Sequence, residues 1–153
     1  MAKKTAGLLM FRRKDKCLQV LLAHPGGPYW IHKDQGAWSM PKGEYEDDEE
    51  PLQAAQREFQ EETGFAVCAP YVALGTVKQP GGKMLIAWAF EGDCDPTQLV
   101  SNMFALEWPP KSSELRSFPE MDKAEWFDLD QARAYIMKGQ IPFLDELETR
   151  CSR

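Results

Sequence analysis

The chain has 153 residues, of which 43% are hydrophobic and 27% charged, and its formal net charge is −6. This length suits one domain with a proper core, so we expect a single domain over residues 1–153. The acidic balance argues against broad electrostatic binding to nucleic acid or to membranes, so any anionic ligand would have to be held by local positive charge.

Two apolar runs open the chain, residues 5–11 and 18–23, and the charged residues between them predict a β-hairpin. An irregular loop follows to about residue 36. Within this loop, Tyr29 and Trp30 carry flat rings that could stack on a base, with ordinary packing as the alternative.

Trp38 and Lys42 lead into the acidic centre of the chain. We expect Trp38 to be buried in the core, although its position also makes it a candidate for stacking on a base. Lys42 directly precedes Gly43, and we favour a contact with phosphate over a solvated turn lysine. The reason is that an acidic protein needs a cation near an anionic substrate.

The segment between Pro51 and Gly64 predicts a helix. Proline suits the first turn of a helix, and glycine suits the residue just past its end. Leu52, Ala55 and Phe59 recur at helical spacing and would form the stripe that faces the core.

Three glutamates on this helix share one face, because Glu58, Glu61 and Glu62 stand at i, i+3 and i+4. Like charges at this spacing repel by about 0.2–0.5 kcal/mol per pair on an isolated helix, so the face favours a bound cation. Carboxylates without a His or Cys cluster are hard oxygen ligands, which favour Mg²⁺, or Mn²⁺, over Zn²⁺.

Neighbouring residues are expected to support this metal site. Arg57 can form a forked ion pair with Glu49 and so pin the incoming loop to the helix. Gly43 would let the backbone turn tightly at the mouth of the site and offer its carbonyl to the metal.

The rest of the chain alternates strands and helices. The expected elements are strands at 71–78, 84–90 and around 124–127, a mobile loop over the site at 108–119, a helix from Asp128 to about residue 138, and a last helical segment at 142–150. Strands on both sides of a central helix, followed by C-terminal helices, indicate a layered α/β fold.

The acidic segment 43–65 resembles the complete box of the Nudix hydrolases. The matching positions are Gly43, Glu49, Arg57, Glu58, Phe59, Glu61, Glu62, Gly64 and Phe65. The family more often has an aliphatic residue at the position of Phe65, a difference that concerns packing. A solvated acidic helix is the alternative reading, but it gives no reason to fix glycine and arginine as well.

The resemblance implies an α/β/α sandwich around a mixed β-sheet and hydrolysis of a diphosphate bond in a nucleoside diphosphate linked to another group. The metal ligands that it implies are Glu58, Glu61, Glu62 and the carbonyl of Gly43. Glu120 resembles a further glutamate that dinucleoside tetraphosphate hydrolases place before a comparable tryptophan strand, and Glu114 is the competing candidate. Spacing leaves open which of the carboxylates, Glu58 and Glu61 among them, is a ligand and which is the general base.

Carboxylates that hold Mg²⁺ can clamp a pyrophosphate and activate water for in-line attack at phosphorus. Residues 38–43 and 139–144 resemble the dinucleoside tetraphosphate branch, so a dinucleoside polyphosphate or an NTP is the first candidate substrate, with Lys42 and Lys83 flanking its phosphates. Pro80 resembles a marker of ADP-ribose hydrolases, which keeps ADP-ribose or a nucleoside diphosphate sugar as the alternative. A non-catalytic nucleotide-binding module on the same fold is the third possibility.

The location of the protein is inferred from what the sequence lacks. No run approaches the length of a membrane span, and the apolar residues 6–11 are too short for a signal core. Its four cysteines are far apart and are expected to be free thiols of a reducing compartment. We therefore expect a cytoplasmic protein whose partner is a small nucleotide; the sequence leaves its oligomeric state open.

Overall fold

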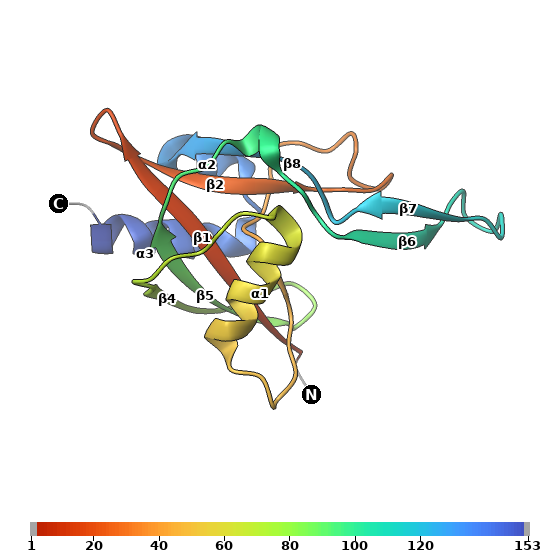
Figure 1. The fold of residues 1–153 in the computed structure, drawn as a ribbon, viewed down its shortest axis with the longest axis horizontal. Coiled ribbons are helices and arrows are strands. Elements are labelled where there is room, and N and C mark those ends of the chain that lie inside the picture. The colour runs from red at the N-terminus through yellow and green to blue at the C-terminus, as the bar shows by residue number, and fades with distance from the viewer. Residues whose placement is uncertain (1–2, 152–153) are drawn as a thin grey trace.

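The structure is a computed structural model that describes residues 3–151 (Figure 1). In chain order its elements are β1 (Lys4–Lys14), β2 (Cys17–Pro25), β3 (Lys42–Glu44), α1 (Pro51–Thr63), β4 (Val72–Lys78), β5 (Met84–Glu91), the 3₁₀ turn η1 (Pro96–Gln98), β6 (Met103–Glu107), β7 (Leu115–Pro119), β8 (Met121–Asp128), α2 (Leu129–Tyr135), the 3₁₀ turn η2 (Lys138–Gln140) and α3 (Ile141–Cys151). None of the helices in this range is long and apolar enough to cross a membrane.

A mixed sheet forms the centre of the molecule, with strand order β4-β5-β1-β2-β8 and with β3 paired to β1. β1 runs parallel to β5 and antiparallel to β2 and β3. Helix α1 packs on one face of the sheet, and α2 and α3 cover the other (Figure 1). The expected α/β/α sandwich is confirmed.

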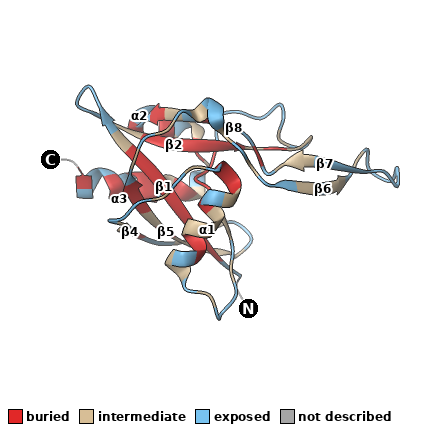
Figure 2. Ribbon diagram, viewed as in Figure 1, coloured by how far each residue is buried: buried red, intermediate tan, exposed pale blue. Residues whose placement is uncertain are grey.

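The first two strands form the predicted hairpin, and the first of them is apolar because both of its faces are buried. The predicted β-hairpin is confirmed, with Phe11 opposite Val20 and with its turn at Asp15 and Lys16. Both turn residues have positive φ, 52° and 67°, as a type I′ hairpin turn requires. The middle of β1 is buried on both sides, because one face meets α1 and the other meets the C-terminal helices (Figure 2).

Helix α1 begins and ends where its sequence predicts. Pro51 opens the first turn, and Gly64 ends the helix in the left-handed region (φ 76°), where its N–H donates to the carbonyl of Gln60. Ala55 and Phe59 are fully buried, and the Phe59 ring packs edge-on against Phe90. Leu52 is only partly buried, so the core stripe lies further along the helix than the periodicity suggested.

Two expectations about the second half of the chain are wrong. Residues 108–119, expected as a mobile loop over the site, form the turn and the second strand of a hairpin in which β6 pairs with β7 and which projects from the body (Figure 1). Its turn is ordered by Glu107, whose carboxylate accepts from the N–H groups of Lys111 and Ser113. Helix α2 ends at Tyr135 and not near residue 138, because the next residue is extended and pairs with Trp38.

Candidate active site

The C-terminal half of α1 faces a cavity of about 530 Å³ that is also walled by β3 and by the start of β6. The lining residues are Thr5, Lys42, Gly43, Glu44, Glu58, Glu61, Glu62, Lys83, Asn102, Met103 and Glu120. The cavity therefore collects every carboxylate that the sequence predicted as a metal ligand, together with both lysines predicted to flank phosphates.

Glu62 is the most enclosed of these carboxylates, with 8% of its surface exposed. Burial raises its pKa to about 8, with a further contribution from the nearby charge of Glu58, and one oxygen accepts from the backbone N–H of Lys42 at 3.3 Å. Burial also raises the pKa of Glu58, although Arg57 opposes this rise. Two carboxylates held together at this depth favour the arrival of positive charge.

Arg57 forms the predicted fork with Glu49. Its Nε and Nη2 donate to the two carboxylate oxygens of Glu49 at 2.8 and 3.0 Å. The remaining Nη1 donates to Glu58 at 2.9 Å and to Glu61 at 3.2 Å. One guanidinium thus ties the loop before α1 to two of the helix carboxylates.

One of the two roles expected of Gly43, the tight turn, is wrong. It lies in the short strand β3 opposite Ala6, so it does not make a tight turn. A side chain at this position would overlap the carboxylate of Glu58. The absence of a Cβ at Gly43 is what lets α1 bring Glu58 against the β3 backbone.

Glu120 is held at the cavity by Asn102, which lies in the segment that leads into β6. Asn102 donates its backbone N–H to the carbonyl of Glu61 and accepts, through its own carbonyl, from the N–H of Glu120, both at 2.8 Å. Two backbone hydrogen bonds therefore fix Glu120 beside the end of α1. The competing candidate, Glu114, lies near the tip of the β6–β7 hairpin, where it pairs with Arg116, and does not line the cavity.

The donor set fits a hard divalent ion, because every anionic group in the cavity is a carboxylate. Among residues 3–151, however, no three His, Cys, Asp or Glu side chains already stand where they could hold one ion. Arg57 occupies oxygens of Glu58 and Glu61. Arg57 bonds only one oxygen of Glu58, and each carboxylate oxygen has two lone pairs, so these contacts leave both residues able to bind an ion.

The tryptophans do not join this cavity. Trp38 is 2% exposed, its ring packs edge-on against Phe127, and its indole N–H donates to Asp34. The core role of Trp38 is confirmed, and a ring with so little exposed surface does not offer the stacking platform that was considered for it. Trp30 is partly exposed, but it lies outside the cavity lining, and the ammonium of Lys33 lies 4.9 Å from its ring centroid.

The two lysines supply local positive charge. Lys83 pairs with Glu44 at 3.0 Å, and burial lowers the pKa of Lys42 against the opposing influence of Glu62. Thr5, Asn102 and Met103 also line the cavity, and sequence reasoning did not assign them to the site. Their sequence signals are weak, because strand pairing and the chain path bring them there.

A family model described as the NUDIX domain matches residues 1–147. Among curated proteins, the chain is 39% identical over 98 residues to an octanoyltransferase of Myxococcus xanthus, a match that covers 63% of this chain and 24% of that protein. It is 66% identical over 29 residues to Nudix hydrolase 25 of Arabidopsis thaliana, covering 19% of this chain and 17% of that protein. These alignments span a quarter or less of the length of either relative.

Solved structures share the fold at low sequence identity. The NUDIX domain of Shewanella oneidensis NrtR, in complex with ADP ribose, superposes with a TM-score of 0.68 at 17% identity, covering 98% of this chain and 88% of that one. A binary complex of a C. elegans Ap4A hydrolase gives 0.63 at 19% identity, covering 99% and 98%. The glutamate motif and the sandwich fold are consistent with this family match, which covers nearly the whole chain. The chain therefore belongs to the NUDIX domain family.

Proposed function

We propose that the protein is a Mg²⁺-dependent hydrolase that cleaves a diphosphate bond in a nucleoside polyphosphate, with a dinucleoside polyphosphate or an NTP as substrate. The observation that carries the proposal is a cavity shared by the three glutamates of α1, by Glu120 between β7 and β8, and by Lys42 and Lys83. Anionic and cationic groups on the same cavity suit a metal-bound phosphate chain.

Each residue has a distinct task in this proposal. Glu58, Glu61, Glu62 and the Gly43 carbonyl would hold the ion, and the side chain of Glu120 would approach it when substrate binds. Mg²⁺ bound here would neutralise phosphate charge and lower the pKa of a coordinated water. Lys42 and Lys83 hold the phosphates, while Arg57 and Glu49 fix the orientation of the helix carboxylates.

The structure discriminates less clearly between a nucleoside polyphosphate and ADP-ribose or a nucleotide sugar as the substrate. The burial of Trp38 removes one of the rings proposed to hold a base. Tyr29 and Trp108 remain outside the core, packed edge-on with ring centroids 5.2 Å apart. The loss of Trp38 as a stacking ring weakens the case for two bound bases and so favours the alternative, ADP-ribose or a nucleoside diphosphate sugar. One of the structures of the same fold holds ADP ribose.

A substrate panel tests the proposal. We expect kcat/KM for diadenosine tetraphosphate or ATP to exceed that for ADP-ribose and a nucleotide sugar under identical Mg²⁺, with products identified by chromatography. A preference of about tenfold or more for either of the last two would overturn the substrate assignment and leave the hydrolase assignment intact.

The metal assignment needs a separate test. Glu62→Gln keeps the shape of the side chain and removes its charge, so we expect a folded protein whose turnover falls by about a hundredfold or more. Glu46→Gln changes an exposed glutamate of the loop before α1 and serves as the matched control. Full activity of Glu62→Gln, or of the parent in excess chelator, would contradict the proposal, and absence of turnover in the parent would favour a nucleotide-binding module.

A further inference from the structure

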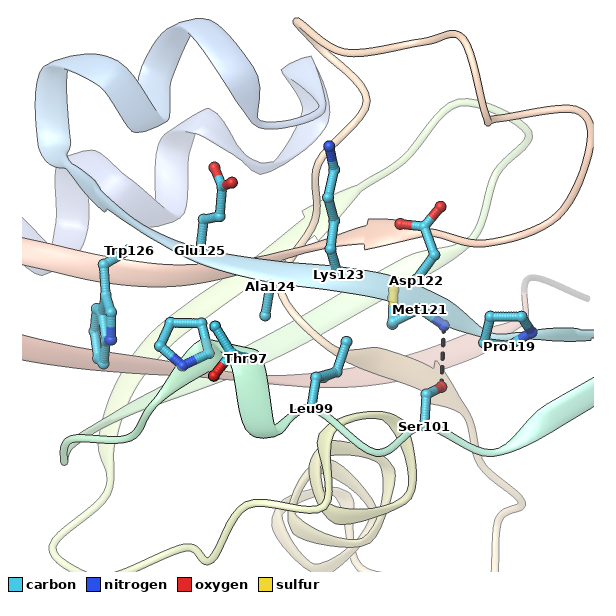
Figure 3. Close-up of a pocket in the computed structure, with 11 residues that line it drawn as sticks. Thr97, Leu99, Ser101, Pro119, Met121, Asp122, Lys123, Ala124, Glu125 and Trp126 are labelled. Atoms are coloured by element: carbon cyan, nitrogen blue, oxygen red, sulfur yellow. Dashed lines mark hydrogen bonds between the residues drawn. The ribbon is translucent and has the colours of Figure 1, made fainter.

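Strand β8 is the last strand of the sheet, paired with β2 on one side only. No strand in the described residues 3–151 pairs with its outer edge. A hollow of about 610 Å³ lies along this edge between β8 and residues 96–101 (Figure 3), and a second of about 350 Å³ lies between β8 and the residues around Trp38 and Tyr135. Lys123, Glu125 and Trp126 line both hollows, so there is space beside this part of the edge on both faces of the sheet, while Met121 at the start of β8 donates its N–H to Ser101.

One lysine and one glutamate stand two residues apart on the same side of β8. Lys123 and Glu125 are both exposed, point to the same side of β8 and flank Ala124, which is 5% exposed (Figure 3). The Lys123 ammonium lies 5.4 Å from the centroid of the Trp38 ring. Glu125 makes no ion pair or hydrogen bond with any described residue. One positive and one negative charge therefore stand on an open strand edge without an ionic partner.

An open edge is a template for another strand, and proteins usually blunt it with charges. Here the charges are self-complementary. When two identical strands pair antiparallel about a two-fold axis, each contact occurs twice. An axis through Ala124 places Lys123 opposite Glu125 of the partner subunit, and the reverse pair forms by symmetry. An axis through either charged residue would instead place like charges opposite each other.

We propose that β8 pairs antiparallel with β8 of a second copy of this chain, about a two-fold axis at Ala124, so that the two sheets become continuous. The two hollows give room for the partner strand and its side chains on both faces of the edge. Neither Lys123 nor Glu125 lines the acidic cavity, so this surface is separate from the proposed active site.

Charge reversal tests the pairing. The parent should sediment as a dimer over a concentration series, whereas Lys123→Glu alone and Glu125→Lys alone should each be monomeric. An equimolar mixture of the two variants should form a heterodimer, because the acidic edge of one then faces the basic edge of the other. The double variant, with both charges exchanged, should dimerise like the parent.

Lys14→Glu is the control for Lys123→Glu. It makes the same change in net charge at an exposed position at the end of β1 and should leave the dimer intact. Circular dichroism of each variant checks its fold, and recovery of the dimer in the mixture excludes a folding defect as the cause of dissociation. The proposal is overturned if the parent stays monomeric, if a single reversal still dimerises, or if the mixture fails to associate. A monomeric parent that captures an extended peptide at this edge would also overturn it.

Discussion

The contact between Gly43 and Glu58 shows how a residue without a side chain shapes this site. The Glu58 carboxylate occupies the space that a Cβ at Gly43 would need. Glu58 in turn receives a hydrogen bond from Arg57, which is locked by its fork to Glu49. The position of one proposed ligand therefore depends on three neighbours, none of which has to touch the substrate.

Gly43→Ala should disturb this arrangement without unfolding the protein. The new methyl group would displace the Glu58 carboxylate, while the strand conformation of β3 suits alanine as well as glycine. Because a misplacement of about 1 Å can lower activity by about a hundredfold, we expect kcat/KM to fall roughly tenfold to a hundredfold. Steady-state kinetics together with a thermal melt will measure both effects.

Gly139→Ala is the matched control for this variant. The nearest atom to its new methyl group would be Pro80 Cδ at 3.6 Å, an ordinary contact. We expect parental kinetics from Gly139→Ala. If Gly43→Ala retained parental activity as well, the close approach of Glu58 to β3 would not matter for turnover.

Among the elements, the segment that leads from η1 into β6 joins two distant parts of the proposed site. Val100 donates its backbone N–H to the carbonyl of Thr63, and Asn102 bridges Glu61 and Glu120. The β6–β7 hairpin then returns the chain so that Glu120 lies beside the end of α1. An element expected as a mobile loop thus has a defined register and holds a carboxylate at the cavity.

Glu120→Gln tests whether this placement serves catalysis. A group that acts mainly in the transition state should affect kcat more than KM, and we expect kcat to fall by about a hundredfold with KM changed far less. Glu114→Gln, near the tip of the same hairpin, should match the parent. Equal kinetics for Glu120→Gln and the parent across pH would make Glu120 a surface residue only.

At the scale of the whole molecule, the acidic cavity opposes folding while it lacks a cation. Burial disfavours the ionised form of Glu62, and Glu58 and Glu120 add like charge nearby. A cation that binds only the folded state relieves this cost and stabilises the protein by mass action.

Mg²⁺ should therefore raise the midpoint of thermal unfolding. At a concentration about 100-fold above its dissociation constant, the rise should be roughly 5–10 °C for a protein of this size. Differential scanning calorimetry of chelator-treated protein will measure it, with NaCl at equal ionic strength as the control. Glu62→Gln should respond less than the parent, and an equal response to NaCl and MgCl₂ would argue against a specific site.

The sequence by itself determined the features that depend on local spacing. Pro51 and Gly64 set the ends of α1, the i, i+3, i+4 spacing placed three glutamates on one face, and the separation of Glu49 and Arg57 predicted their fork. The β1–β2 hairpin followed from two apolar runs and a charged turn. These features were predictable because each depends on residues a few positions apart, whose relative placement follows from backbone geometry.

Only the tertiary structure decided which distant segments meet. Strand order brings Lys83 to the cavity and leaves β8 at the edge of the sheet, and a backbone bridge through Asn102 places Glu120. Packing against His24 of β2 and Phe127 of β8 buries Trp38, which no local pattern separates from an exposed stacking ring. The physical reason is that burial and long-range contact depend on how the layers stack, whereas periodicity fixes only which residues share a face.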